Sequence, residues 1–264
     1  MKKIVAKLML TVLIVSAMVG LMGRQIVMTD SHVQASAPTA AERDRAVQEL
    51  NRMADIKWKT SSSLYIYNHT YTTSTTYTGM PYTQTYNNTY DEFVRSGAYN
   101  GKQLTYMGNA KMGNDCSTVP ALAWKFKYSS IKYADIWTGD YLTCAQNGTN
   151  SSYHLATVGG YTMGSKDTKQ FATGKGLNSM TKYYKELKKG DCCFYRWYDD
   201  TSDNKKDWKW RGHVVVVVGT YADGVYITDQ IGWSSGDSFS TWRHIYKLSY
   251  SDLYKKYYVP VKFV

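Results

Sequence analysis

The stretch Gly212-His213-Val214-Val215-Val216-Val217-Val218-Gly219 decides the fold class of this chain. Five consecutive valines with polar ends predict a β-strand that is covered on both faces, because a half-exposed strand would alternate apolar with polar residues. Ala222-Asp223-Gly224 predicts the turn that follows, and Val225 to Asp229 the return strand. The chain is therefore expected to contain an antiparallel hairpin with a buried first strand that begins at His213.

Helices are expected mainly before this hairpin. Residues 38–56 predict a helix, with Thr39 as N-cap and Glu42 completing a capping box. A second helix is expected over 117–127, and Pro120 is tolerable only in its first turn, where the missing N–H has no intrahelical partner. Helices followed by antiparallel strands indicate an α+β fold. Further elements are expected as short helices at 91–96, near Thr181 and at 251–257, a strand at 192–197, a hairpin loop at 199–209 and an edge strand at 258–261.

Two segments predict little regular structure. Residues 59–78 are rich in Thr, Ser and Tyr, which fits either an extended loop or a pair of exposed strands. Residues 129–180 contain several Gly, Asn and Thr clusters, which are typical of loops. Neither segment contains an internal repeat.

The N-terminus has the pattern of a secretory signal peptide. Met1-Lys2-Lys3 is basic, Leu8 to Met22 is an apolar run too short for a usual membrane span, and Ala35-Ser36-Ala37 is a small-x-small cleavage site. We expect residues 1–37 to be removed, with an uncleaved anchor as the alternative. The protein is then secreted and extracellular, and its contact with the membrane is limited to export.

The charge of the chain points to an anionic partner outside the cell. The 264 residues carry a net charge of +11, and removal of residues 1–37 would leave 28 basic and 20 acidic residues, a net charge of +8. A bacterial wall or its acidic polymers would attract such a protein. No basic stretch has a nucleic-acid motif, so nucleic acid is not expected as a partner. We expect a monomer.

The four cysteines are Cys116, Cys144, Cys192 and Cys193. Export would permit disulfides, and four cysteines allow three full pairings among which the sequence does not choose. Cys192-Cys193 lies in an apolar strand-like segment, where burial as small hydrophobic residues is expected. No Cys-x-x-Cys motif or Cys/His ligand spacing is present, so neither a metal nor another cofactor is expected.

Cys116 and His213 are the candidate catalytic pair. Cys116 lies at the start of the helix expected over 117–127, where backbone N–H groups and the helix dipole favour a thiolate. Asp115 and Ser117 flank it, and these polar residues suit the mouth of a site better than a core. A histidine at the end of a valine strand can act as a base, and Asp229 or Gln230, at the end of the neighbouring strand, could orient its imidazole.

Four pieces of the chain resemble the NlpC-type peptidases of bacterial cell walls. They are Tyr77-Thr78-Gly79-Met80-Pro81-Tyr82, Gly113-Asn114-Asp115-Cys116-Ser117, Leu187-Lys188-Lys189-Gly190-Asp191 and Gly212-His213-Val214, in the order of that family. The resemblance covers roughly residues 77–232. It implies a papain-like fold in which the helix carrying the nucleophile packs on an antiparallel sheet. It also implies hydrolysis of peptide or isopeptide bonds in peptidoglycan stem peptides.

The resemblance implies a role for each matching residue. Cys116 would be the nucleophile, His213 the general base, and Asp229 or Gln230 the third member. Tyr82 would line the site and help to bind the oxyanion with the backbone N–H of Cys116. Gln84 is a second candidate for that donor role.

The chain also departs from the family. Thr118-Val119-Pro120 replaces the Gly-aromatic-aliphatic sequence that usually follows Asp-Cys-Ser, and residues 129–180 form additional material. We expect an N-terminal helix and Tyr/Thr-rich extension over 38–76 and one hydrolase domain over 77–264. Two alternatives are a papain-like amidase or transpeptidase with another substrate, and a non-catalytic wall-binding module.

Overall fold

The computed structural model describes residues 37–108, 112–165, 167–199, 210–232 and 240–264. Ala37–Val264 form one compact unit. The expected signal peptide at 1–37 lies outside the described residues except for Ala37, and so does the expected loop at 199–209 except for Asp199. Within the described ranges, no helix combines the length and the apolar character needed to cross a membrane.

A seven-stranded sheet forms the centre of the fold, and every neighbouring pair in it is antiparallel. The expected valine strand lies in its interior, with Val214 to Val218 buried, and the hairpin turn and return strand follow as predicted. The order across the sheet is β12 (Trp242–Ser249), β11 (Gly224–Gln230), β10 (Trp210–Tyr221), β9 (Cys192–Tyr198), β13 (Val259–Phe263), β8 (Leu155–Thr157) and β7 (Thr149–Asn150).

The last strand is not the edge strand that the sequence predicted. β13 pairs with β9 on one side and with β8 on the other, and Pro260 lies opposite Cys193. Pro260 lacks the N–H that a ladder residue normally donates. Its carbonyl accepts a 2.5 Å hydrogen bond from the buried Tyr161 hydroxyl. The sequence predicted an edge strand because proline favours edges. In the structure, β8 pairs with β13 on that side, and β8 lies in a segment for which no strand was predicted.

A smaller sheet includes residues on both sides of the expected boundary between 76 and 77. Its order is β4 (Tyr77–Thr78), β1 (Lys57–Thr60), β6 (Gln103–Tyr106) and β5 (Gly97–Tyr99), with β1 and β6 parallel. Between β1 and β4 in the sequence, β2 (Leu64–Ile66) and β3 (His69–Tyr71) form a separate hairpin. Trp58 is the centre of this sheet's core, with ring centroids of Tyr71 and Tyr77 at 4.9 and 5.0 Å. The Tyr-rich tract therefore supplies core aromatics as well as surface.

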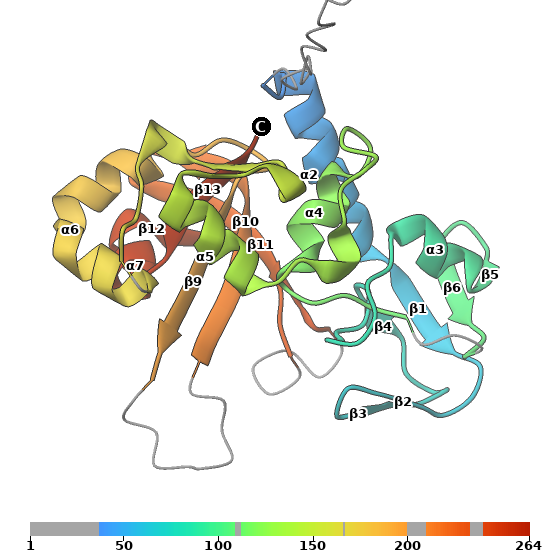
Figure 1. The fold of residues 1–264 in the computed structure, drawn as a ribbon. Coiled ribbons are helices and arrows are strands. Elements are labelled where there is room, and N and C mark those ends of the chain that lie inside the picture. Colours follow the sequence, from blue (N-terminus) through green and yellow to red (C-terminus); the bar gives the residue numbers. More distant parts are fainter. Residues whose placement is uncertain (1–36, 109–111, 166, 200–209, 233–239) are drawn as a thin grey trace, which may run out of the picture. The chain divides into compact units, whose positions relative to one another are not determined.

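The helices flank the large sheet (Figure 1). α6 and α7 lie together at one end, α5 lies across a sheet face, and α2 and α4 lie at the other end beside the smaller sheet. The expected capping box of Thr39 and Glu42 is present at α2. The helices are α2 (Ala40–Asp55), α3 (Tyr90–Arg95), α4 (Thr118–Trp124), α5 (Thr138–Asn147), α6 (Thr168–Tyr184) and α7 (Tyr250–Lys255), with 3-10 turns at Tyr133–Asp135, Ser151–Tyr153 and Val158–Gly160.

The segment 129–180, for which the sequence predicted no helix, contains α5 and most of α6. α6 begins at Thr168 rather than near Thr181, because Asp167 caps it by accepting a 2.9 Å hydrogen bond from the Gln170 N–H. It is kinked at Gly176, whose φ is +74°. Phe171, Met180 and other apolar residues of α6 are buried, so tertiary packing stabilises a helix that its glycines disfavour.

Candidate active site

Asp115 positions the segment that carries Cys116. Its Oδ1 accepts hydrogen bonds from the N–H groups of Ser117 (2.8 Å) and Thr118 (2.9 Å), and from the Ser117 hydroxyl (2.7 Å). Asp115 thus satisfies two N–H groups at the start of α4, whose N-cap residue is Ser117 and whose first residue is Thr118, and Pro120 lies in the first turn as expected. All seven residues of α4 are buried, whereas Cys116 is partly exposed. The helix therefore anchors the thiol at the boundary between core and solvent.

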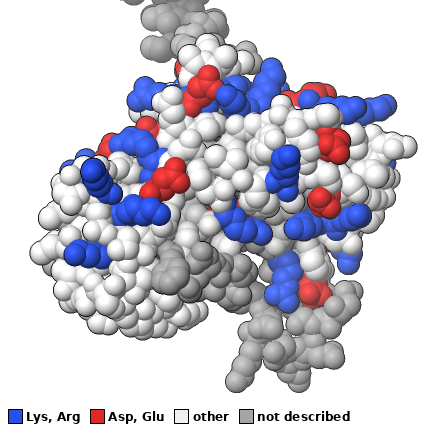
Figure 2. All heavy atoms as spheres, turned by 180° about the vertical axis from the view of Figure 1, so that it is seen from behind, with Lys and Arg blue, Asp and Glu red and all other residues white. Residues whose placement is uncertain are grey.

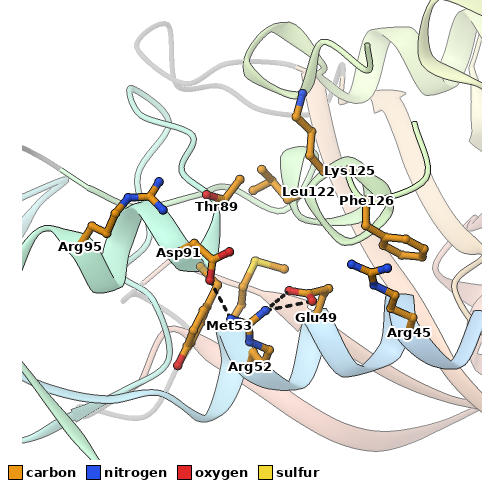
Figure 3. A pocket seen from close by; sticks show the side chains of 11 residues that line it. Arg45, Glu49, Arg52, Met53, Thr89, Asp91, Arg95, Leu122, Lys125 and Phe126 are labelled. Atoms are coloured by element: carbon orange, nitrogen blue, oxygen red, sulfur yellow. Dashed lines mark hydrogen bonds and ion pairs between the residues drawn. The ribbon is translucent and has the colours of Figure 1, made fainter. Parts of the chain in front are cut away.

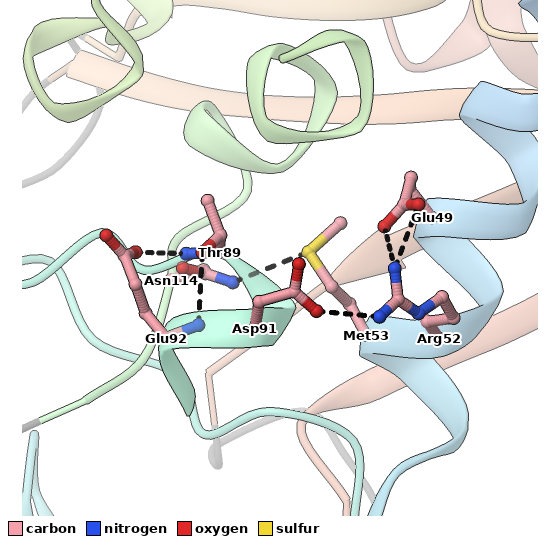
Figure 4. Close-up of polar contacts among 7 residues, drawn as sticks. All are labelled: Glu49, Arg52, Met53, Thr89, Asp91, Glu92 and Asn114. Carbon is pink, nitrogen blue, oxygen red and sulfur yellow. Dashed lines mark hydrogen bonds and ion pairs between the residues drawn. The ribbon is translucent and has the colours of Figure 1, made fainter. Parts of the chain in front are cut away.

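Asn114 ties this segment to α2 and to the turn at Pro81. It is fully buried, and its Nδ2 contacts the sulfur of Met53 at 3.8 Å (Figure 4). Its N–H donates to the Pro81 carbonyl at 3.1 Å, and its carbonyl accepts from the Thr83 N–H at 2.9 Å. These bonds form a parallel bridge between Asn114 and Tyr82. Tyr82 is thereby placed next to the cysteine segment although 34 residues separate it from Cys116.

His213 lies on β10, and the glycine before it allows α5 to approach. A Cβ at Gly212 would lie 2.8 Å from the Oγ1 of Thr138, the first residue of α5. Only glycine fits this approach without a shift of the Thr138 side chain or of the helix that carries it. β10 pairs His213 with Tyr195 and Gly212 with Arg196 on β9. Gly212 thus lets α5 pack close to the strand that carries His213.

The structure brings His213, Asp229 and Cys116 together. Nε2 of His213 lies 2.5 Å from Oδ2 of Asp229, and Cys116 is the second hydrogen-bond and charge partner of the imidazole. Because Asp229 uses Nε2, the thiol is left with Nδ1. Arg243 on β12 binds both oxygens of Asp229, with 3.1 Å from its Nε to Oδ1. The arrangement is a nucleophile, a base and an orienting carboxylate.

The electrostatics of this cluster favour a charged imidazole. Burial lowers the pKa of His213, but the negative charges of Cys116 and Asp229 and their hydrogen bonds outweigh it and raise the pKa to about 10. Burial also raises the pKa of Asp229, yet His213 and Arg243 hold it below its usual value. At neutral pH the site therefore contains an imidazolium that is bound to the Asp229 carboxylate.

Gln230 performs a different task from Asp229. Its Nε2 donates to the carbonyls of Met80 (2.8 Å) and Pro81 (3.0 Å), so it supports the turn that leads to Tyr82. It is fully buried and contributes to the lining of the site. Its Oε1 has no hydrogen-bond partner among the described residues. Of the two candidates for the third residue, only Asp229 contacts the imidazole.

Tyr82 and Gln84 form a donor pair in the same pocket. Gln84 Nε2 donates to the Tyr82 hydroxyl at 3.0 Å, and both residues line the pocket with Cys116. Burial and the nearby charge of Cys116 raise the pKa of Tyr82 far above its usual value. The hydroxyl therefore keeps its proton and can donate a hydrogen bond to an oxyanion. Asp115 and Ser117 also line the pocket, but their polar atoms are engaged in the cap of α4.

These residues line one open pocket with a volume of about 700 Å³. Sequence reasoning missed Tyr67, Trp137, Thr138, Tyr195, Arg196, Trp210 and Arg243, which also line it. Arg243 lies directly opposite Asp229 in the pairing of β11 with β12, so a correct register would have found it. Trp137 and Arg196 belong to no motif and lie in or beside the additional material. Within the described chain, no group of three His, Cys, Asp or Glu residues is placed to hold a metal ion.

A second pocket, of about 290 Å³, lies among α2, α3 and α4 (Figure 3). Arg52 at its centre is bound to Glu49 at 2.8 Å and to Asp91 at 2.7 Å. Arg45 lies over the ring of Phe126, 4.2 Å from its centroid. The described residues that line this pocket include no cysteine or histidine, and its two carboxylates are paired with Arg52.

Comparisons of the chain with protein-family models, with curated proteins and with solved structures give no match.

Proposed function

We propose that this protein is an exported papain-like cysteine hydrolase of NlpC type that cleaves peptide or isopeptide bonds in peptidoglycan stem peptides. One observation carries the proposal: the imidazole of His213 is bound to the Asp229 carboxylate and interacts with Cys116 at an open pocket of about 700 Å³. A thiolate, a charged imidazole and an orienting carboxylate are the groups that cysteine hydrolases need.

The first half of the reaction forms a thioester. The Cys116 sulfur attacks the carbonyl carbon of the scissile amide, and the carbonyl oxygen becomes an oxyanion. The Tyr82 hydroxyl and the backbone N–H of Cys116 donate to that oxygen. The C–N bond then breaks as the imidazolium of His213 gives a proton to the leaving nitrogen, and the free amine departs.

The second half hydrolyses the thioester. Neutral His213 takes a proton from a water molecule, which attacks the same carbonyl carbon. The C–S bond breaks, the carboxylic product leaves, and the thiolate–imidazolium pair is restored. Asp229 remains ionised throughout and holds the imidazole through Nε2, so that Nδ1 faces the sulfur and the substrate.

Two features support a wall substrate. The four sequence pieces that resemble NlpC-type peptidases include the positions of Tyr82, Cys116 and His213. Lys and Arg side chains are dispersed over the face in Figure 2, with acidic side chains among them. Such a distribution provides a general attraction to an anionic wall rather than a groove for one polymer.

Limiting thiol alkylation near neutral pH, followed by peptide mass mapping, tests the thiolate–imidazole pair. We expect fast labelling at Cys116 that is slowed in His213→Ala, whereas the buried Cys144, Cys192 and Cys193 remain unlabelled in the folded protein. Hydrolysis of defined muropeptides is then measured for wild type and Cys116→Ala. We expect the variant to lose at least about 10³-fold in rate.

Three results would contradict the proposal. Full hydrolysis by Cys116→Ala would exclude Cys116 as nucleophile. Labelling of Cys116 that is slow, or independent of His213, would exclude an activated pair. Binding of purified wall by wild type with no turnover, unchanged in Cys116→Ala, would favour the wall-binding module instead.

A further inference from the structure

Arg196 is held between two tryptophans in the wall of the catalytic pocket. Its guanidinium carbon lies 4.5 Å from the ring centroid of Trp137 and 4.7 Å from that of Trp210. Its Nη1 donates a 3.0 Å hydrogen bond to Oγ1 of Thr138. Two stacked indoles and one hydrogen bond fix the plane of the guanidinium before any ligand arrives.

This guanidinium has no counter-charge in the described part of the chain. No carboxylate there forms an ion pair with Arg196, whereas Arg243 is bound to Asp229 and Arg211 to Asp199. Partial burial lowers the pKa of Arg196, which reflects the cost of holding a cation away from water. A semi-buried cation without a partner is unfavourable unless a ligand supplies the missing charge.

Arg196 shares the pocket with Cys116 and His213. Arg196 pairs with Gly212 across β9 and β10, and the next pair in the same register includes His213. Arg196, both tryptophans and Cys116 line the same pocket. Trp137 is 54% exposed and Trp210 is 38% exposed, so both indoles are accessible to a ligand in that pocket.

We propose that Trp137, Arg196 and Trp210 form a subsite that binds a free carboxylate of the substrate close to the scissile amide. A carboxylate matches the planar fork of a guanidinium in a bidentate geometry. One Arg196 nitrogen is engaged by Thr138, and the others remain to bind the ligand. The inference rests on the proposed function, and it defines the substrate class as acidic peptides rather than their amidated counterparts.

Two matched peptides test the subsite through hydrolysis. They are a stem peptide with a free carboxylate next to the scissile amide and the same peptide with a carboxamide at that position. We expect wild type to prefer the acidic peptide by about 10- to 100-fold in kcat/KM, and Arg196→Gln to lose that preference. Arg196→Lys keeps the charge but not the fork, so it should retain part of the preference. Arg211→Gln removes one positive charge outside the pocket and should leave the preference unchanged.

A second test needs no substrate. Iodoacetate and iodoacetamide both alkylate Cys116 with loss of iodide, but only iodoacetate is an anion. We expect the ratio of the iodoacetate rate to the iodoacetamide rate to fall by about tenfold in Arg196→Gln and to change little in Arg211→Gln. A melting curve for each variant verifies that it is folded.

The two tests separate the subsite from the proposed function. If wild type cleaves no peptide and the reagent ratio still falls in Arg196→Gln, the anion subsite stands and the proposed hydrolysis fails. If Arg196→Gln is folded but leaves both the peptide preference and the reagent ratio unchanged, the subsite is overturned. If Arg196→Gln loses activity equally on both peptides and the ratio of the iodoacetate rate to the iodoacetamide rate is unchanged, Arg196 only holds α5 against the sheet.

Discussion

Oδ2 of Asp229 lies 2.5 Å from Nε2 of His213, at the point where β11 ends beside β10. Arg243 holds the same carboxylate from the neighbouring strand β12. Asp229 is buried, so its charge is compensated by protein groups rather than by water. The imidazole is therefore oriented by a carboxylate that is itself fixed, and this rigidity is what a base beside a thiol requires.

Asp229→Asn should change both the rate and the pH profile of hydrolysis. His213 has a pKa of about 10, raised by Cys116 and by Asp229, and it must carry a proton to release the amine. Wild-type activity should therefore fall as the pH rises through about 10. In Asp229→Asn the carboxylate no longer raises the pKa of His213, so this alkaline limb of the activity should move to lower pH. The rate should fall by about 10²- to 10⁴-fold, as measured by kcat/KM against pH.

The same pKa shift has a consequence for stability. Because the folded state raises the pKa of His213 from 6.5 to about 10, its contribution to stability is complete below pH 6.5 and is lost as the pH rises through about 10. Urea unfolding from pH 6 to pH 10 should show a smaller loss of stability in Asp229→Asn than in wild type. An alkaline limb and a stability profile that are both unchanged in the variant would contradict the assignment of Asp229.

Arg243→Gln should weaken the site without removing its three catalytic groups. The buried carboxylate of Asp229 would lose its bidentate partner, which costs about 1–3 kcal/mol of folding stability. The pKa of Asp229, now held below its usual value, should rise, and the acid limb of hydrolysis should move to higher pH. Arg52→Gln is the control, because Arg52 also binds carboxylates but at the surface. Equal effects of the two variants on stability would contradict the role of Arg243.

Gly212→Ala should perturb the contact between α5 and the strand of His213. The new Cβ would lie 2.8 Å from the Thr138 hydroxyl oxygen, and such overpacking costs about 1–3 kcal/mol. Gly219→Ala on the same strand is the matched control, since its Cβ would lie 3.4 Å from the Tyr226 ring, an ordinary contact. Chemical denaturation measures both. Similar stabilities for the two variants would show that α5 can move away at little cost.

Arg43→Ala should destabilise the protein strongly. Arg43 on α2 binds Asp191 at 2.7 Å, and the side chains are only 11% and 1% exposed. Removal of one partner from a buried pair costs about 3–5 kcal/mol, because the other charge stays buried. Lys189→Ala is the control: Lys189 joins the same helix through Asp44, but the side chains are 50% and 53% exposed. We expect its effect to stay within about 0.5 kcal/mol in urea unfolding.

Local pattern predicted the elements that depend on local physics. The capping box of Thr39 and Glu42, the buried valine strand and the turn before Gly224 formed where expected. Each of these rests on interactions within a few residues or on a run of one residue type. α5 and the start of α6 were missed, because Gly, Asn and Thr lower the helix propensity of a segment that packing against the sheet nevertheless makes helical.

The sequence by itself determined the α+β class, and it placed Cys116 before a helix and His213 directly before the buried valine run, although the strand itself begins at Trp210. The tertiary structure alone decided between Asp229 and Gln230, because the irregular register of β11 against its neighbours determines which of two adjacent side chains reaches the imidazole. It also brought Arg243 and the Trp137–Arg196–Trp210 group to the pocket. These contacts join residues far apart in the chain, and their position depends on strand pairing and helix packing, which no local propensity encodes.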